Sequence, residues 1–488
     1  MSCALADIRD ALRRAGLLAG ERGAVPESID TITDDSRTVV PGALFLAVRG
    51  TERDGHTYLT VAAERGAAAA IVDDPSRTTL PVLIVSDTRR AAAIAASVFH
   101  RDPASALRLV GVTGTNGKST VASMLRHLLD EESARAASVG TLGVLVGSAG
   151  TPLEGGGGLT TPGPVELQRV LRVLYDRGVR TVAMEASSHA LHQRRVEGLV
   201  FAAAVFTNLT RDHLDYHGTM EEYFVAKAHL MGQLACDGVA VINTDDPAWN
   251  ALPAAPRTVR FGLGDAADVR ATAVECAPGG SRFELVFGGK AYDVTLPLIG
   301  DFNVANALAA AACAWALGVT ADTIVARLAT MPQVPGRLEI VHSQPTVLRD
   351  YAHTPDALAR AIDAVRPFAA GRLIVVFGCG GDRDRGKRPE MGRIAAERAD
   401  VAIVTSDNPR TEDPERILDD IEAGMDGVPH ERIEDRRNAI ARALEIAAPD
   451  DLVLLAGKGH ETYQVRGTTR LPFDERQIVR EIISEGVN

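Results

Sequence analysis

Short apolar runs alternate with segments of helical periodicity along most of the chain. In the first hundred residues this alternation predicts a small α/β domain, with a sheet covered by helices. An Asp-Pro pair at residues 102–103 marks the expected end of that domain. The expected strands and helices of this part cover residues 4–15, 41–48, 58–65, 67–72, 82–85 and 88–99.

The same alternation continues through the rest of the chain and predicts mostly parallel sheets there too. Residues 259–298 differ, because β-rich segments separated by glycines indicate strands or hairpins at a domain edge. The other expected strands cover residues 109–112, 179–185, 200–206, 238–243, 346–350, 372–377, 401–405 and 452–455. The other expected helices cover residues 121–129, 164–175, 221–231, 355–365 and 389–398, and a long helix begins near residue 300.

A glycine-rich turn joins the strand at residues 109–112 to the helix that follows it. Glycines let the backbone approach an anion, and the free N–H groups of a helix N-terminus favour one. Lys118 would reach the β- and γ-phosphates of a nucleotide, and Ser119 would ligate Mg²⁺. The spacing departs from a strict Walker motif, because Val112 stands where its first glycine belongs. The turn consists of Gly114, Thr115, Asn116, Gly117, Lys118, Ser119 and Thr120.

Candidate metal ligands follow the next two strands. Glu185 ends one of them, and an acidic residue at such a strand end meets Mg²⁺ directly or through water. Two histidines and two aspartates follow the other strand, and His213 is the better candidate for a second Mg²⁺. The residue pattern alone leaves Glu185 open as a solvated strand end. It favours a solvated charge for Lys227, on the helix at residues 221–231.

Polar residues also gather at element ends in the second half of the chain. Asn303 and Asn306 lie on one helix face, where they could bind a purine or phosphate or cap the helix; capping is expected for one of them. The glycines after residue 377 do not form a dinucleotide fingerprint, since its third glycine would fall at Arg383. Three strand ends carry a charge mixture that suits a zwitterionic ligand, namely Arg383, Arg410, Lys458 and Glu461.

The net charge and the cysteine pattern limit the classes of binding partner and the cellular compartment that the sequence fits. A net charge of −12 over 488 residues argues against a general nucleic-acid or membrane-surface binder. The five cysteines are scattered without a C-x-x-C pair, which fits a reducing cytosol. The N-terminus becomes charged too early for a signal peptide, and the most apolar segment, residues 305–317, is too short to span a bilayer. We therefore expect a soluble cytoplasmic protein that acts on small molecules, as a monomer.

Six motifs, taken together and in order, resemble the Mur ligases of peptidoglycan synthesis. They are Thr113-Gly-Thr-Asn-Gly-Lys-Ser, Glu185-x-Ser-Ser-His, Asn208-Leu-x-x-Asp-His-Leu-Asp-Tyr-His, Pro335-Gly-Arg-x-Glu, Asp350-Tyr-Ala-His-x-Pro and Gly457-Lys-Gly-His-Glu. The resemblance implies three α/β domains. A small N-terminal domain (residues 1–104) would hold the UDP end of a substrate, a central P-loop ATPase domain (105–337) would have a mostly parallel sheet, and a C-terminal Rossmann-like domain (338–488) would bind an amino acid.

The resemblance also implies a reaction, in cytoplasmic synthesis of the cell-wall precursor. ATP, with Mg²⁺, would phosphorylate the γ-carboxylate of D-Glu in UDP-MurNAc-L-Ala-D-Glu. An amine of meso-2,6-diaminopimelate would then attack the acyl phosphate and form an amide. Because two anions must approach one another, such a site needs concentrated positive charge.

Roles at the ATP site follow from the same resemblance. Ser119 and Glu185 would hold one Mg²⁺ and His213 would help to hold the second. Lys227 stands where relatives carry a carbamylated lysine, which reverses its reading as a solvated charge. Besides the phosphate loop, the implied adenine, phosphate and ribose contacts are Asn306, Arg337 and Asp350. The implied catalytic residues are Lys118, Lys227, His213 and Arg337.

The other two substrates are assigned in the same way. Arg410 would pair with the distal carboxylate of diaminopimelate, which lysine lacks. Two departures weaken the uridine contacts: Leu159 replaces an Asn, and Thr51-Glu52-Arg53 replaces a His-Gln pair. The implied UDP-substrate contacts are Ser36, Thr160, Thr161, Ser187, Gln193 and Arg195. The implied diaminopimelate contacts are Arg383, Asp407, Asn408, Pro409, Arg410, Gly457 and Glu461.

Three other protein classes fit parts of the sequence. Folylpolyglutamate synthetase shares a similar phosphate loop but lacks the Asp-Asn-Pro-Arg and Gly-Lys-Gly-His-Glu combination. A nucleotide-switch or transport NTPase does not explain a third domain suited to an amino acid. An NAD-dependent oxidoreductase is disfavoured by the glycine spacing near Arg383.

Overall fold

The computed structural model describes residues 2–51, 53–156, 158–277 and 279–485, and the chain divides into two compact units. One unit holds residues 1–270, 286–290 and 306–327. The other holds residues 271–285, 291–305 and 328–488. Among the described residues, no helix combines the length and apolar character needed to cross a bilayer.

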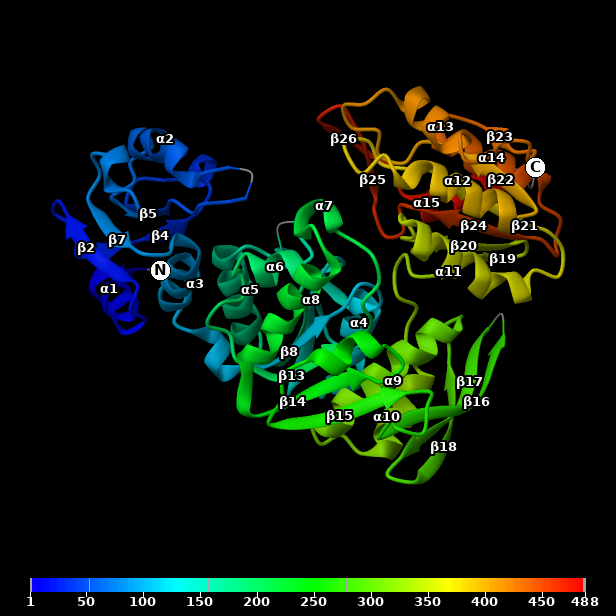
Figure 1. Ribbon diagram of the computed structural model, residues 1–488, viewed down its shortest axis with the longest axis horizontal. Coiled ribbons are helices and arrows are strands. Elements are labelled where there is room, and N and C mark those ends of the chain that lie inside the picture. The colour runs from blue at the N-terminus through cyan, green and yellow to red at the C-terminus, as the bar shows by residue number, and fades with distance from the viewer. Residues whose placement is uncertain (1, 52, 157, 278, 486–488) are drawn as a thin grey trace. The chain divides into compact units, whose positions relative to one another are not determined.

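The N-terminal part of the first unit is a five-stranded sheet between helices (Figure 1). Its order is β2-β7-β6-β5-β4, with only β2 antiparallel to its neighbour. Side chains alternate along β5, so that Leu44 packs with α1 and α3 while Phe45 packs with α2. The elements are β2 (Leu18–Arg22), β4 (Thr31–Thr33), β5 (Ala43–Leu46), β6 (Ala69–Val72), β7 (Val82–Val85), α1 (Leu5–Arg14), α2 (Leu59–Glu64) and α3 (Thr88–Phe99), beside a short pair, β1 (Cys3–Ala4) and β3 (Ser28–Ile29).

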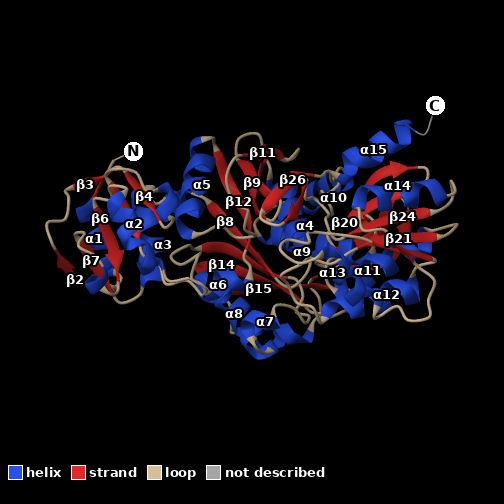
Figure 2. Ribbon diagram, turned by 90° about the horizontal axis from the view of Figure 1, so that it is seen from above, coloured by secondary structure: helices blue, strands red, loops and turns tan. Residues whose placement is uncertain are grey.

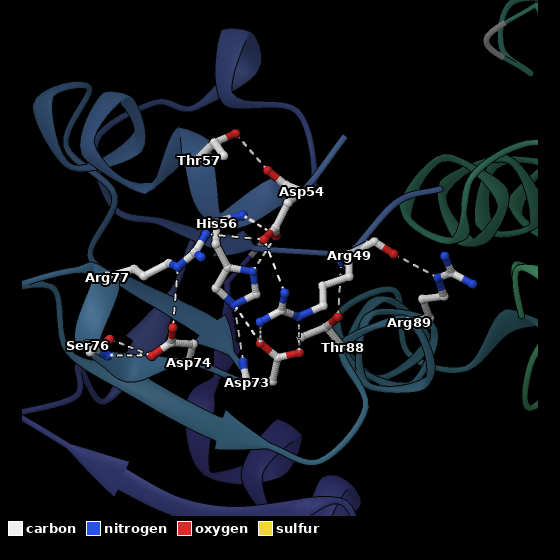
Figure 3. Close-up of polar contacts among 10 residues, drawn as sticks. All are labelled: Arg49, Asp54, His56, Thr57, Asp73, Asp74, Ser76, Arg77, Thr88 and Arg89. Atoms are coloured by element: carbon white, nitrogen blue, oxygen red, sulfur yellow. Dashed lines mark hydrogen bonds and ion pairs between the residues drawn. The ribbon is translucent and has the colours of Figure 1, made fainter. Parts of the chain in front are cut away.

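A buried histidine ties together the loops at the C-terminal ends of β5 and β6 (Figure 3). The ring nitrogens of His56 lie 2.7 Å from Asp54 Oδ1 and 3.0 Å from Asp73 Oδ1. Arg49 bridges the same two carboxylates, donating to Asp73 at 2.6 Å and to Asp54 at 3.2 Å. This network holds Arg49 and Asp54, which lie on either side of Thr51 and Arg53 in the sequence. Glu52, part of the same departure from the family pattern, lies outside the described residues.

The central sheet has the order β11-β10-β9-β12-β8-β13-β14-β15-β16-β17-β18. Strands from β9 to the start of β16 run parallel, and β10 and β11 add antiparallel strands at one edge. Its strands are β8 (Arg108–Thr113), β9 (Arg135–Gly140), β10 (Gly143–Val146), β11 (Thr151–Leu153), β12 (Val179–Glu185), β13 (Phe201–Phe206), β14 (Leu234–Asn243), β15 (Arg257–Gly262), β16 (Val269–Ala277), β17 (Gly280–Phe287) and β18 (Lys290–Leu296). The helices between residues 118 and 329 are α4 (Lys118–Leu129), α5 (Pro164–Asp176), α6 (Ser188–His192), α7 (Leu214–His217), α8 (Met220–Ala228), α9 (Asp301–Ala316) and α10 (Ala321–Ala329).

The second unit contains a six-stranded sheet of order β19-β20-β24-β21-β22-β23 with helices on both faces (Figure 2). Alternate side chains of β21 divide between the faces: Val375 packs with α11, α12 and α13, and Ile374 with α14 and α15. Its strands are β19 (Glu339–Ser343), β20 (Thr346–Asp350), β21 (Leu373–Phe377), β22 (Val401–Val404), β23 (Glu431–Arg432) and β24 (Leu452–Ala456), with a separate hairpin of β25 (Tyr463–Arg466) and β26 (Thr469–Pro472). Its helices are α11 (Pro355–Val365), α12 (Lys387–Arg398), α13 (Pro414–Glu422), α14 (Arg436–Ile446) and α15 (Glu475–Glu485).

The α/β alternation predicted from the sequence is confirmed, and most expected elements agree with the structure to within a few residues. The helix expected at residues 221–231 ends earlier, because α8 stops at Ala228 and a 3₁₀ turn, His229–Gln233, follows. Strands β9, β10 and β11 and the hairpin β25–β26 were not anticipated. The domain limits at residues 104 and 337 remain predictions.

We predict that His56→Phe destabilises the protein, because phenylalanine keeps the volume but removes both imidazole contacts to Asp54 and Asp73. The expected loss is about 1–3 kcal/mol of the free energy of unfolding, measured by urea denaturation. Arg37→Ala is the control, since the Arg37 side chain is 85% exposed and forms a surface ion pair with Asp35. Equal stability of His56→Phe and the wild type would show that the network is not stabilising.

Candidate active site

The phosphate loop is held by backbone contacts to the segment after β13. The Thr115 N–H donates to the Asn208 carbonyl at 2.7 Å, and the Asn116 N–H donates to Asn208 Oδ1 at 2.9 Å. Lys118 Nζ donates to the carbonyls of Gly114 and Thr115 at 3.0 and 2.7 Å. The loop is therefore fixed in shape, and α4 begins at Lys118, as a phosphate cradle at a helix N-terminus requires.

Two positions in the loop need glycine. Gly114 has φ 147°, and a Cβ there would lie 1.9 Å from Thr207 Oγ1. Gly117 has φ 86°, and a Cβ there would lie 2.3 Å from Asn306 Oδ1. The second contact places Asn306 against the loop, and its predicted contact with adenine stays a prediction. The other asparagine, Asn303, donates to the Ile299 carbonyl at 2.8 Å and so has a local structural role.

Glu185 is a buried carboxylate at the C-terminal end of β12, only 2% exposed. It accepts hydrogen bonds from the Thr141 N–H at 2.8 Å and from the Thr141 hydroxyl at 3.2 Å. Gly140 packs against it, because a Cβ there would lie 2.1 Å from Glu185 Oε1. Within the described ranges it has no lysine, arginine or histidine partner. A buried anion without a cation is costly, so the site fits a divalent metal ion such as Mg²⁺.

Lys227 is 1% exposed, so the residue pattern's reading of it as a solvated charge is wrong. Its Nζ donates to the Gly114 carbonyl at 2.7 Å and lies 4.4 Å from the centroid of the Tyr223 ring. Burial, with the nearby charge of Lys118, holds the pKa of Lys227 well below its usual value. The structure thus places a buried amine with a lowered pKa beside the phosphate loop.

His213 lies in a segment crowded with rings at the start of α7. It has a left-handed backbone, with φ 55°, and its ring centroid is 4.7 Å from that of His189. Its Nε2 lies 3.4 Å from Asp212 Oδ2. Desolvation by these surroundings lowers the pKa of His213; Asp212 opposes that shift, and the charges of Lys118 and Lys227 add to it. A neutral imidazole suits a metal ligand.

Five of the six predicted UDP-substrate residues belong to one hydrogen-bonded group. Thr161 Oγ1 donates to the Glu185 carbonyl at 2.7 Å, and the Ser187 N–H donates back to that hydroxyl at 3.1 Å. Arg195 donates to the Thr161 carbonyl at 3.0 Å and to Gln193 Oε1 at 2.6 Å. Thr160 joins through Thr141 Oγ1, at 3.1 Å.

The sixth residue, Ser36, begins a 3₁₀ turn that Asp35 caps, accepting from the Arg37 N–H at 2.9 Å. Asp34 comes two residues before Ser36. Burial raises the pKa of Asp34, and the charge of Arg195 partly opposes that rise. Leu159, one of the departures from the family pattern, is 47% exposed.

In the second unit, two buried carboxylates shape the turn that carries Arg337. Asp350 accepts from the N–H groups of Leu338 and Ala352, at 2.7 and 2.8 Å. Glu339 accepts from the Gly336 N–H at 2.7 Å. The Arg337 guanidinium lies 4.8 Å from the centroid of the Tyr351 ring. Backbone contacts thus occupy both Asp350 oxygens, and its predicted ribose contact stays a prediction.

The loop after β24 packs directly against this turn. A Cβ on Gly336 would lie 2.2 Å from the His460 nitrogen and 2.6 Å from Gly459 Cα. A Cβ on Gly459 would in turn lie 2.7 Å from Tyr351 Cβ. The two loops therefore meet backbone to backbone.

The predicted amino-acid contacts converge where β21, β22 and β24 end. Arg410 Nη1 donates to the Gly381 carbonyl at 2.7 Å, and a Cβ on Gly380 would lie between Arg410 Nη1 and Arg383 Cγ, at 2.8 and 3.9 Å. Asn408 Nδ2 donates to Glu461 Oε2 at 2.8 Å. The hairpin β25–β26 supports this loop, because the Arg410 N–H donates to the Val465 carbonyl at 3.0 Å.

Several contributors were missed by sequence reasoning. Asn208 holds the phosphate loop, Thr141 holds Glu185, and Gln464 donates to the Asp407 carbonyl at 2.8 Å. Asn208 is the first residue of one of the six family motifs, so the motif could have indicated its role. Neither Thr141 nor Gln464 lay in a pattern that distinguishes it from a surface residue.

We predict that Gly117→Ala weakens nucleotide binding at least roughly tenfold, since the added Cβ must displace Asn306. Binding of fluorescent ADP would measure it. The matched control is Gly178→Ala, because Gly178 has φ 82° and open space around its Cα. Both variants carry the same left-handed strain. If both lost affinity equally, strain rather than the Asn306 contact would be the cause.

Comparison with known proteins agrees with this geometry. Three family models match in order: "Mur ligase family, catalytic domain" at residues 28–112, "Mur ligase middle domain" at 112–314, and "Mur ligase, glutamate ligase domain" at 336–459. A Geobacillus thermodenitrificans protein is 45% identical over 478 residues, covering 95% of this chain and 96% of its own length. A Gloeobacter violaceus protein is 45% identical over 487 residues, covering 98% of each. Both are named UDP-N-acetylmuramoyl-L-alanyl-D-glutamate–2,6-diaminopimelate ligase.

Solved structures match over similar lengths. One, of a UDP-N-acetylmuramoyl-L-alanyl-D-glutamate–2,6-diaminopimelate ligase, is 35% identical with a TM-score of 0.65, covering 95% of this chain and 96% of that one. Mycobacterium tuberculosis folylpolyglutamate synthase, complexed with ADP and AMPPCP, has a TM-score of 0.64 at 23% identity, covering 76% of this chain and 92% of its own. That second likeness concerns the fold alone. The matched segments and the identity of 45% over nearly the whole length show that this protein belongs to the Mur ligase family.

Proposed function

We propose that this protein uses ATP to join 2,6-diaminopimelate, in its meso form, to the D-Glu γ-carboxylate of UDP-MurNAc-L-Ala-D-Glu. The observation that carries the proposal is the 45% identity, over 95% of the chain, to a ligase named for this reaction. It would act in the cytoplasm as a monomer, on small molecules alone. The proposed division of labour is residues 1–104 for the UDP end, 105–337 for ATP and 338–488 for the amino acid.

Phosphoryl transfer would take place at the loop of residues 114–120. A carboxylate is a poor nucleophile toward a phosphate that is itself anionic, so positive charge and positioning supply most of the catalysis. Lys118 would turn from the Gly114 and Thr115 carbonyls toward the β- and γ-phosphates. Asn306 would contact the adenine end, while Arg337 and Asp350 would contact phosphate and ribose. The product is an acyl phosphate on the substrate, with ADP as the leaving group.

Mg²⁺ fits the donor set that the chain offers. Ser119 and Glu185 would hold one ion and His213 would help to hold a second, with phosphate oxygens completing each shell. Bound there, the ions would neutralise charge on the phosphates and align the γ-phosphate. The buried Glu185 carboxylate, which in the described part of the chain forms no ion pair with lysine, arginine or histidine, is the support for this assignment.

Lys227 would carry a carbamate. The uncharged form of its amine, which the lowered pKa favours, can attack CO₂, forming an N–C bond and releasing a proton, and the product is an anion. An ammonium at this place would be repelled by Mg²⁺, whereas a carbamate is a suitable ligand or orienting group. Its burial and the low pKa of its amine support this role.

The remaining substrates would bind at the two polar groups described above. Ser36, Thr160, Thr161, Ser187, Gln193 and Arg195 would hold the UDP-MurNAc-dipeptide. Arg383 and Arg410 would bind carboxylate, and Glu461 would bind ammonium, with Asp407, Asn408, Pro409 and Gly457 shaping the site. A half-buried Arg410 left without a carboxylate would disfavour lysine.

The proposal is tested by phosphate release with ATP, Mg²⁺ and UDP-MurNAc-L-Ala-D-Glu, plus meso-diaminopimelate, lysine or no acceptor. Turnover is expected with diaminopimelate and not in Lys118→Ala. Release only with a folate and glutamate would instead make the protein a folylpolyglutamate synthetase. A normal rate in Lys118→Ala would contradict the role of the phosphate loop.

We predict that Arg410→Ala raises KM for diaminopimelate about a hundredfold, because it removes a charge-assisted pair with the distal carboxylate. KM for ATP should stay unchanged, and the preference over lysine should narrow. Arg416→Ala, on the exposed side of α13, serves as the control. Equal wild-type turnover with lysine and diaminopimelate would contradict this role for Arg410.

We predict that Lys227→Ala loses most of its turnover and regains part of it with small carboxylic acids, which can replace the carbamate. Labelled bicarbonate should give a carbamate carbon signal in the wild type that this variant lacks. Lys290→Ala changes a lysine on β18 that is exposed and should keep full activity. An unaffected rate in Lys227→Ala would reject the carbamate.

A further inference from the structure

We infer that Lys458 is a positioning residue of the amino-acid site, holding Asp407, Asn408 and Glu461 in the arrangement that receives the acceptor's ammonium group. The inference rests on the proposed function, because that function makes these residues substrate contacts. Lys458 itself is not proposed to touch the substrate.

The Lys458 ammonium group is enclosed by three acceptors. The side chain is 0% exposed, and Nζ lies 3.0 Å from Asn408 Oδ1, 3.1 Å from Glu461 Oε2 and 3.5 Å from Asp407 Oδ1. An ammonium group has three N–H donors, so these acceptors can engage all of them. The rings of Tyr463 and Phe473 lie 5.9 Å from the same atom and close the cavity.

The acceptors belong to loops that follow different strands. Asp407 and Asn408 come after β22, and Glu461 comes after β24, separated in the sheet by β21. The side chains of Asp407 and Glu461 are 8% and 14% exposed, and two such buried carboxylates repel one another when no cation lies between them. Lys458 therefore supplies the charge that lets the two loops share one site.

The hydrogen bonds of Asn408 fix the orientation of its side-chain amide and, through it, that of the Glu461 carboxylate. Its Oδ1 accepts from Lys458 and from the Val465 N–H at 2.9 Å, so its Nδ2 must face Glu461, to which it donates at 2.8 Å. Glu461 Oε2 thus receives two donors and the carboxylate cannot rotate freely. In the described part of the chain, Glu461 Oε1 and Asp407 Oδ2 accept no hydrogen bond. These two oxygens are the ones that remain for an ammonium group of the substrate.

The test is Lys458→Met, which keeps much of the length and removes the charge. KM for the amino acid should rise about tenfold to a hundredfold, while KM for ATP and for the UDP-substrate stays within about twofold and kcat at saturation is largely kept. The measurement uses whichever amino acid the wild type turns over. Failure of diaminopimelate as acceptor would then overturn the proposed function without touching this inference.

The double variant Lys458→Met with Glu461→Gln separates positioning from general destabilisation. If Lys458 acts by holding Glu461, the double variant should match Glu461→Gln alone in KM for the amino acid and should regain thermal stability lost by Lys458→Met. Because it removes one charge of each sign, it is also the variant to use if Lys458→Met does not fold. Additive effects of the two changes would overturn the inference.

Asp451→Asn is the matched control. Asp451 lies just before β24, at the opposite end of the strand from Lys458; it is 4% exposed and is held by Arg372 at 2.8 Å. The Asp451→Asn variant should have a lower melting temperature and an unchanged KM for the amino acid. An unchanged KM in Lys458→Met, or an equal rise in Asp451→Asn, would overturn the role of Lys458.

Discussion

Two lysines donate to one carbonyl oxygen, that of Gly114, and the chemistry of the ATP site depends on this. Lys118 approaches it at 3.0 Å and Lys227 at 2.7 Å. Two ammonium groups on one acceptor would repel each other strongly in a buried site. Burial and the neighbouring charge of Lys118 hold the pKa of Lys227 down, which favours its uncharged form and so reduces this repulsion. The phosphate loop therefore sets the reactivity of a side chain far from it in sequence.

The second unit also brings like charges close together, but there the charges are negative. Strand ends of a parallel sheet bring loops together whatever charges they carry. There, two carboxylates meet around the buried ammonium group of Lys458, while Arg383 and Arg410 lie near Gly380. The first unit lowers the pKa of one of its two neighbouring amines, and the second places a buried ammonium group beside its two carboxylates.

The sequence predicted the features that depend on local pattern, such as the order of strands and helices. It predicted less well which polar side chains are buried. Alternating apolar runs fixed the order of strands and helices, and the glycine-rich turn marked the phosphate loop. On α8 the pattern misled, because Val225 is 47% exposed whereas Lys227 is 1% exposed, the reverse of an ordinary amphipathic helix. Only the family resemblance pointed to the buried role of that lysine. The contact of Val465 with Arg410 and that of Thr141 with Glu185 join segments distant in sequence, which no local periodicity encodes.

The contact of Gly336 with Gly459 and His460 limits how such a protein can diverge. Since the two loops touch through backbone atoms, no side chain at that point can shrink or rotate to accommodate a change in either loop. Arg337 directly follows Gly336, and Glu461 lies two residues after Gly459. A descendant that took a different acceptor could exchange the side chains that face it. It would have to inherit the path of the main chain through Gly459 unchanged.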